Sequence, residues 1–208
     1  TSNGIGISGI GPGARIAAIQ IAIPAAKDVE LVRGLNLIAA LRAVELSGAR
    51  VASLSWGIKF VDSENYGAVR DQISSLNKET FEGFDLILVT GPTASGKTSL
   101  AVALAHRLNG EIISADSRQV YRGMDIGTGK DYDDYYIDGS RIACHMIDIV
   151  DPGYKYNVFE YQRDFFKVYR SLKERKVFPV VCGGSGMYAD SIIKAYKMTE
   201  VPPDSGLR

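Results

Sequence analysis

Apolar and polar residues alternate in blocks along this chain of 208 residues, and the first blocks predict two strands around a helix. Residues 14–23 and 50–56 are short apolar runs typical of buried strands. Between them, residues 35–47 place Leu37 and Leu41 on one face, as an amphipathic helix would. The order strand, helix, strand predicts a βαβ unit with a buried parallel pair.

A second strand and helix series follows a polar stretch. Apolar runs bounded by turn residues indicate strands, and longer blocks with helical periodicity indicate helices. The predicted strands are 84–90, 111–115, 145–150 and 177–182, and the predicted helices are 97–108, 158–175 and one starting near Ser185. This alternation favours an α/β domain built on a parallel sheet. We therefore divide the chain into residues 1–70, a junction at 71–83, and a domain at 84–208.

A glycine-rich motif joins the first strand and first helix of the second series. It satisfies the pattern G-x-x-x-x-G-K-[ST] and comprises Gly91, Pro92, Thr93, Ala94, Ser95, Gly96, Lys97 and Thr98. The glycines let several backbone amides point into one cavity, and the helix N-terminus adds positive potential. Lys97 supplies a charge for phosphate oxygens, and Thr98 offers a hydroxyl to Mg²⁺. The alternative is a glycine-rich turn with an exposed lysine. The flanking elements favour a phosphate site and a P-loop NTPase-like sheet with flanking helices.

Asp116 follows the predicted strand at 111–115 directly. Ligands gather at the carboxyl edge of parallel sheets, so this carboxylate is expected to face the phosphate loop. There it could coordinate magnesium or accept a proton. It could equally be a helix N-cap that closes the next turn, and position alone leaves both readings open.

Composition narrows the class of protein. Lys+Arg and Asp+Glu both total 24, so no overall basic field indicates a nucleic-acid partner. Cys144 and Cys182 are far apart and the chain has two histidines, which argues against a disulfide framework or zinc site and suits a reducing cytosol. No apolar run reaches the roughly 20 residues that cross a bilayer.

Four segments together are more specific than the phosphate motif. They read GPTASGKTSLAVALA, SADSRQVYRGMDIGTGK, HMIDIVDP and CGGSGMY, in that order over residues 91–188. In order and spacing this part of the chain strongly resembles the tRNA dimethylallyltransferases. The resemblance implies transfer of a dimethylallyl group from dimethylallyl diphosphate to the N6 amine of an adenosine in the tRNA anticodon loop.

The resemblance also implies roles for the matching residues. Asp116 would be the general base, while Lys97, Thr93 and Mg²⁺ held at Thr98 would act on the diphosphate. Residues in the stretch that meets the flipped-out adenosine and neighbouring RNA would be Asp116, Ser117, Arg118 and Gln119, with Ser185 on the substrate side of a tight glycine turn. The family pattern further implies a cytoplasmic enzyme, expected to act as a monomer.

Two parts of the domain depart from the family pattern. Residues 131–141 are acidic and rich in tyrosine, and we expect a solvated surface loop there. Family members continue well beyond the position of Arg208, so the domain is expected to be incomplete at its C-terminus.

Residues 1–70 resemble a different family. The runs SNGIGISGIGPGARIAAIQI and LIAALRAVELSGARVASLSWG are similar to the interior of a subtilisin-like serine protease. No histidine precedes His106, so no Ser-His-Asp relay can form in this part. Gly4, Gly6 and Gly9 match a dinucleotide fingerprint, but a strand rather than a helix follows them, and we reject it.

Two other functions remain open at this stage. A small-molecule kinase or nucleotide-binding module would explain the phosphate loop but not the segments around Asp116 and Ser185. An inactive phosphate-binding remnant of a fused or truncated gene would share the ancestry of the enzyme and lack its chemistry.

Overall fold

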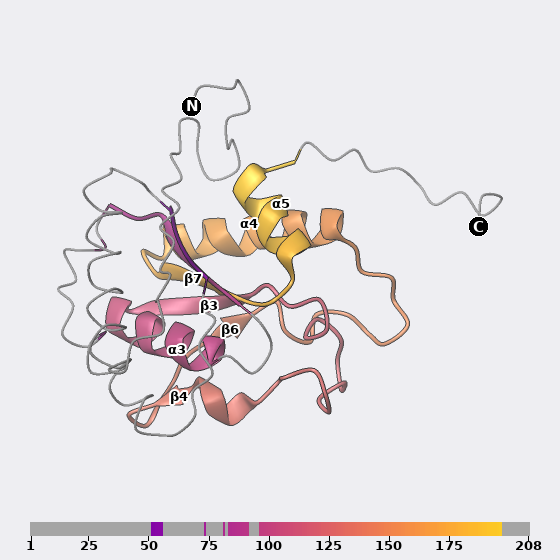
Figure 1. The fold of residues 1–208 in the computed structure, drawn as a ribbon, viewed down its shortest axis with the longest axis horizontal. Coiled ribbons are helices and arrows are strands. Elements are labelled where there is room, and N and C mark those ends of the chain that lie inside the picture. The colour runs from indigo at the N-terminus through magenta and orange to yellow at the C-terminus, as the bar shows by residue number, and fades with distance from the viewer. Residues whose placement is uncertain (1–50, 56–72, 74–80, 82, 92–95, 197–208) are drawn as a thin grey trace, which may run out of the picture.

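A computed structural model describes residues 51–55, 73, 81, 83–91 and 96–196 of the chain (Figure 1). Its centre is a parallel sheet of five strands in the order β1-β2-β7-β3-β6. The strands are β1 (Val51–Ser55), β2 (Leu86–Thr90), β7 (Phe178–Cys182), β3 (Gly110–Ser114) and β6 (Cys144–His145). The predicted α/β class is confirmed. The predicted strand at 14–23 and helix at 35–47 lie outside the described residues.

Helices cover both faces of the sheet. Helix α3 (Lys97–Leu108) lies on one face, and α4 (Val158–Glu174) and α5 (Gly186–Lys194) lie on the other (Figure 1). A capping box starts α4, because Glu160 N–H donates to Asn157 Oδ1 over 3.0 Å and Asn157 N–H donates back to Glu160 Oε2 over 3.2 Å. The predicted bounds of α3 are confirmed, and those of α4 are confirmed to within one residue.

Alternating residues of β2 build the two halves of the core. Ile87 and Val89 pack with α3, whereas Leu86 and Leu88 pack with α4 and α5. All four are at most 1% exposed. A strand buried on both faces reads as a continuous apolar run, which is why the segment could be recognised in the sequence.

The strand predicted at 145–150 is wrong for most of its length. Strand β6 ends at His145, because Met146 and Asp148 adopt positive φ angles of 66° and 55° that interrupt an extended chain. Val150 then makes a single parallel bridge to Tyr121. The segment therefore packs against the loop that follows β3.

The surface segment expected at 131–141 is mostly exposed, but it has regular structure in place of the expected loop. These residues form a 3₁₀ turn, η2 (Tyr132–Tyr135), and a hairpin of β4 (Tyr136–Ile137) and β5 (Ser140–Arg141). Asp138 and Gly139 turn the hairpin with φ angles of 50° and 74°, as an Asp-Gly turn favours. Tyr135 is 5% exposed and belongs to the core cluster that contains α3. Tyr135 and Ile137 pack into this core, whereas the other nine residues of the segment are exposed, as expected for a surface segment.

None of the helices in the described part of the chain is long and apolar enough to cross a bilayer.

Candidate functional site

The described ends of the phosphate loop have the geometry that the motif requires. Gly91 follows β2, and Gly96 precedes α3 with a φ of 77°, in the left-handed region that favours glycine. The carbonyl oxygen of Gly96 accepts the first helical hydrogen bond, from Leu100 N–H, at 3.1 Å. Residues 92–95, which include the predicted Thr93, lie outside the described part.

Lys97 and Thr98 form the first turn of α3. That turn contains no acidic residue, and Gly96 has no side chain to cap it. The amides of this first turn and the helix dipole therefore give the N-terminus of α3 a positive potential that favours an anion. The side chains of both residues are half-buried.

Asp116 closes a turn at the end of β3. Its Oδ1 accepts from Arg118 N–H at 2.9 Å, and its own N–H donates to Ser114 Oγ at 3.3 Å. Residues 117–120 form a turn and not a helix, so Asp116 is not a helix N-cap. The carboxylate is half-buried at the carboxyl edge of the sheet, as predicted.

Ser185 connects the start of α5 to the Asp116 turn. Its Oγ accepts from Ser117 N–H at 2.8 Å and donates to Ser117 Oγ at 3.1 Å. Its own N–H donates to Ala115 O at 3.1 Å. Two residues that are 68 positions apart in the sequence are thus hydrogen-bonded, and the hydroxyl of Ser185 fixes the residue next to Asp116.

The glycines before Ser185 allow this close approach. A Cβ on Gly183 would lie 2.2 Å from the carbonyl carbon and oxygen of Ala115. A Cβ on Gly184 would lie 3.5 Å from the carbonyl oxygen of Gly91. The turn between β7 and α5 therefore sits between the phosphate loop and the Asp116 turn, and all three meet at one edge of the sheet.

Gln119 belongs to the stretch predicted to meet the RNA, but its side chain lies inside the protein. It is 8% exposed, and its amide is used inside the protein. Oε1 accepts from Ser114 Oγ at 2.7 Å, and Nε2 donates to Gly129 O at 2.9 Å. Ser117 and Arg118, by contrast, are exposed on the turn. Gln119 therefore holds the turn through hydrogen bonds inside the protein, while Ser117 and Arg118 face solvent.

Electrostatics link the two charged residues of the site. Burial raises the pKa of the Cys182 thiol to about 12. The charge of Lys97 lowers that pKa and the charge of Asp116 raises it, so both groups lie within electrostatic range of the end of β7. The cation and the carboxylate thus flank one sheet edge from two different loops.

A buried lysine behind the Asp116 turn has no predicted role. The side chain of Lys130 is 0% exposed, and its Nζ donates to Asp148 and to the carbonyl oxygen of Tyr121. Burial raises the pKa of Asp148, but hydrogen bonds from Lys130 and Tyr132 outweigh it and hold that pKa below its usual value. This ion pair anchors the far end of the loop that begins at Asp116. A lysine in a glycine-rich run gives little signal of burial in the sequence.

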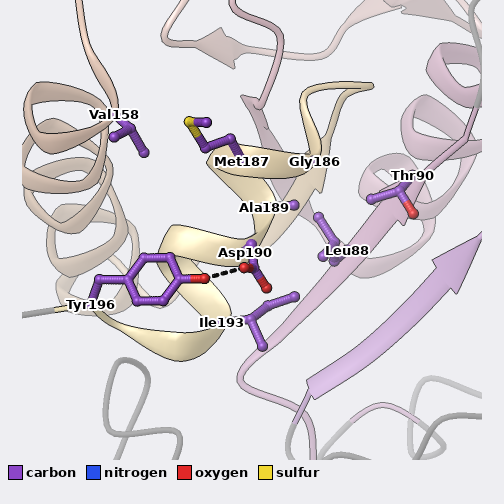
Figure 2. Close-up of a pocket in the computed structure, with 9 residues that line it drawn as sticks. All are labelled: Leu88, Thr90, Val158, Gly186, Met187, Ala189, Asp190, Ile193 and Tyr196. Carbon is purple, nitrogen blue, oxygen red and sulfur yellow. Dashed lines mark hydrogen bonds between the residues drawn. The ribbon is translucent and has the colours of Figure 1, made fainter.

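An open apolar groove of about 760 Å³ lies between α5, the start of α4 and β2 (Figure 2). Leu88 and Ile193 form part of its lining, and the hydroxyl of Tyr196 donates to Asp190 at its rim. Leu88 packs on the face opposite α3. Its lining also includes Thr90 and Gly186, which directly adjoin Gly91 and Ser185, so one end of the groove begins beside the candidate site.

Two side chains of the site carry oxygen donors of the kind that magnesium takes. Thr98 and Asp116 offer a hydroxyl and a carboxylate, the oxygen donors that Mg²⁺ takes. The residues that the structure describes contain no group of three or more acidic, histidine or cysteine side chains that could cage a metal. Mg²⁺ needs no such cage, because it keeps several waters and binds the phosphates of its substrate.

A parallel α/β sheet with helices on both faces and a glycine loop between its strand and helix defines a P-loop-like fold. Comparison with known proteins agrees. Residues 119–208 match the family model described as IPP transferase.

Curated relatives carry related names. The chain is 60% identical over 129 residues to tRNA dimethylallyltransferase 2 of Bacteroides fragilis, covering 62% of this chain and 42% of the relative. It is 58% identical over 127 residues to tRNA dimethylallyltransferase 1 of Parabacteroides distasonis, covering 61% and 41%. The chain therefore spans about two fifths of the length of these relatives.

Solved structures give the same result for the fold. The tRNA isopentenylpyrophosphate transferase of Bacillus halodurans matches with a TM-score of 0.52 and 39% identity, over 59% of this chain and 39% of that one. The corresponding enzyme of Staphylococcus epidermidis matches with a TM-score of 0.50 and 40% identity, over 55% and 37%.

Proposed function

We propose that this chain carries the diphosphate-binding and base-bearing part of an enzyme that transfers a dimethylallyl group to tRNA. The observation that carries the proposal is the junction of three loops at one sheet edge. Lys97 and the N-terminus of α3 supply positive charge, and Asp116 supplies a carboxylate from the neighbouring turn. The relatives named for the same activity support this reading.

In the proposed reaction, the N6 amine of an adenosine attacks C1 of dimethylallyl diphosphate. A C–N bond forms, and the C1–O bond breaks with its electron pair leaving on pyrophosphate. Asp116 takes the proton from the amine as it attacks. Lys97, Thr93 and the amides of the phosphate loop stabilise charge on the departing pyrophosphate, and Mg²⁺ at Thr98 would add to that stabilisation when bound.

The acceptor side of the site is formed by the exposed face of the Asp116 turn. Ser117 and Arg118 stand outward there, where an adenosine of the tRNA anticodon loop would have to be flipped out for its amine to reach Asp116. We place this activity in the cytoplasm, in a monomer. Residues 1–70 take no part in the chemistry.

A binding experiment tests the proposal. Titrated with Mg²⁺ present, the chain should bind dimethylallyl diphosphate more tightly than ATP. Lys97→Ala should weaken binding of the diphosphate by more than about tenfold, because it removes a charge-assisted contact. Lys155→Ala, which removes an exposed lysine before α4, is the matched control and should change nothing.

The outcomes separate the other functions. Tighter binding of ATP than of dimethylallyl diphosphate would favour a small-molecule kinase or nucleotide-binding module. Tight diphosphate binding without any transfer to an anticodon-arm RNA would favour the inactive remnant. Equal binding by Lys97→Ala and the unaltered chain would remove the phosphate-site assignment itself.

A further inference from the structure

The strand that leads into the phosphate loop has the pattern of an interior strand. Leu86, Ile87 and Val89 are 0% exposed and Leu88 is 1% exposed, so both faces of β2 are covered. An interior strand also needs hydrogen-bonding neighbours on both edges, because its N–H and C=O groups cannot reach water. Strand β7 supplies one neighbour, pairing Ile87, Leu88 and Val89 in parallel register.

A hydrogen bond of β2 fixes which of its residues face which neighbouring strand. The carbonyl oxygen of Val89 accepts from Gly183 N–H at 3.2 Å, just beyond β7. In a strand, the N–H and C=O of one residue point to the same side and alternate along the chain. Leu88 and Thr90 therefore direct their backbone groups away from β7, towards the other edge.

That other edge is occupied by β1. All five residues of Val51–Ser55 pair in parallel with Leu86–Thr90, and Ser53 lies opposite Leu88. In a parallel pair, a residue that faces its partner strand bonds to the two residues that flank its opposite number. The N–H of Leu88 thus donates to Ala52, and its carbonyl oxygen accepts from Leu54 N–H. The N–H of Ser53 points away from β2.

Without β1, no other described strand would pair with the backbone groups of Leu88 that face away from β7. Each unpaired buried group costs free energy, and a flat apolar edge strand also templates aggregation. Among the described residues, β1 forms the outer edge of the sheet and meets this need. Residues 56–85 give the connection ample length, since a parallel crossover takes about a dozen residues or more.

We propose that strand β1 (Val51–Ser55) completes the phosphate-binding domain by covering the edge of β2 that β7 leaves open. Its role is structural and independent of any protease ancestry. Thr90 is followed directly by Gly91, so the same pairing fixes the point at which the phosphate loop begins. This second consequence rests on the proposed function, whereas the pairing does not.

Two neighbouring proline substitutions test the pairing. Leu54→Pro removes the N–H that donates to Leu88, whereas Ser53→Pro removes an N–H that faces away from β2 and serves as the matched control. Both prolines keep the backbone extended, but Leu54→Pro also removes an apolar side chain, so Leu54→Ala, which keeps the N–H, controls for that loss. Hydrogen exchange of single amides, read by NMR in the whole chain, should show Leu88 exchanging about tenfold or more faster in Leu54→Pro. The Val89 amide, which faces β7, should change far less.

Hydrogen exchange in the unaltered chain tests the pairing without any substitution. Its Leu88 amide should be protected to a degree similar to that of Val89. Rapid exchange of Leu88 there, or equal effects of the two prolines, would overturn the pairing. If Leu54→Pro does not fold while Ser53→Pro does, the asymmetry itself supports it.

The affinity for dimethylallyl diphosphate tests whether the pairing also affects the phosphate loop. Leu54→Pro should bind dimethylallyl diphosphate several-fold more weakly, and Ser53→Pro should bind it as the unaltered chain does. Unaltered affinity in Leu54→Pro despite faster exchange at Leu88 would retain the pairing and reject its effect on the loop. Absence of binding by the unaltered chain would count against the proposed function, not against the strand.

Discussion

A hydrogen bond from the backbone holds the side chain of Asp116, and this bond determines what a substitution there can reveal. Its Oδ1 accepts from Arg118 N–H at 2.9 Å, and an asparagine oxygen could accept the same bond. Asp116→Asn therefore preserves the turn and removes the charge. The three roles considered for this residue then separate cleanly, because only two of them depend on the charge.

If Asp116 is the general base, Asp116→Asn should leave diphosphate binding nearly unchanged and reduce prenyl transfer by about 10²–10⁴. As a magnesium ligand, it would weaken Mg²⁺-dependent diphosphate binding as well as transfer. As a turn residue alone, it would change neither. Isothermal titration with dimethylallyl diphosphate and a transfer assay on an anticodon-arm RNA distinguish the three. We expect the first pattern, and retained transfer would remove Asp116 from the mechanism.

At the scale of elements, the turn between β7 and α5 has no room for a side chain at its first glycine. A Cβ on Gly183 would meet the backbone of Ala115 at 2.2 Å, and Ala115 directly precedes Asp116. Gly183→Ala should therefore cost about 1–3 kcal/mol in the free energy of unfolding and push the Asp116 turn outward. Gly186→Ala is the control, because nothing lies within 4 Å of its Cβ. Urea denaturation measures both, and equal stability of the two variants would contradict the close packing.

The elements that the sequence predicted well are those whose signal is local. Helix α3 was predicted at 97–108 because a glycine loop starts it and apolar periodicity runs through it. The hairpin at Asp138 and Gly139 was missed because its acidic, tyrosine-rich residues suggested a solvated loop. An Asp-Gly pair was nevertheless a usable signal there.

Pairings across long sequence separations could not be predicted in the same way. Periodicity predicts which face of a strand is buried, but it does not give the register between segments that are far apart. The hydrogen bond from Ser117 to Ser185, the burial of Gln119 and the pairing of β1 with β2 all depend on such contacts. For this reason the sequence predicted the residues of the site better than the interactions that hold them.

At the scale of the whole molecule, one carboxylate joins the start of β3, the end of β6 and the end of α4. Arg175 donates to both oxygens of Glu111 at 2.8 Å, and His145 Nε2 lies 2.6 Å from Oε2. The side chain of Glu111 is 19% exposed and that of Arg175 is 47% exposed. The hydrogen bonds from Arg175 outweigh the opposing effect of burial, and with His145 they lower the pKa of Glu111 from 4.5 to about 2.

This lowered pKa gives the protein an acid-sensitive contribution to stability. Because the folded pKa lies below the unfolded one, the contribution is present above about pH 4.5 and is lost as the pH falls towards about 2. Glu111→Gln should therefore lower the free energy of unfolding at neutral pH, by less than about 1 kcal/mol for a half-exposed pair. Between pH 4.5 and 2 its stability should fall less steeply than that of the unaltered chain. Arg175→Gln should flatten the same region in part, because His145 remains, and the double variant should flatten it no further than Glu111→Gln alone. Urea denaturation across this pH range measures all four proteins, and parallel curves for Glu111→Gln and the unaltered chain would show that the carboxylate does not couple these elements to pH.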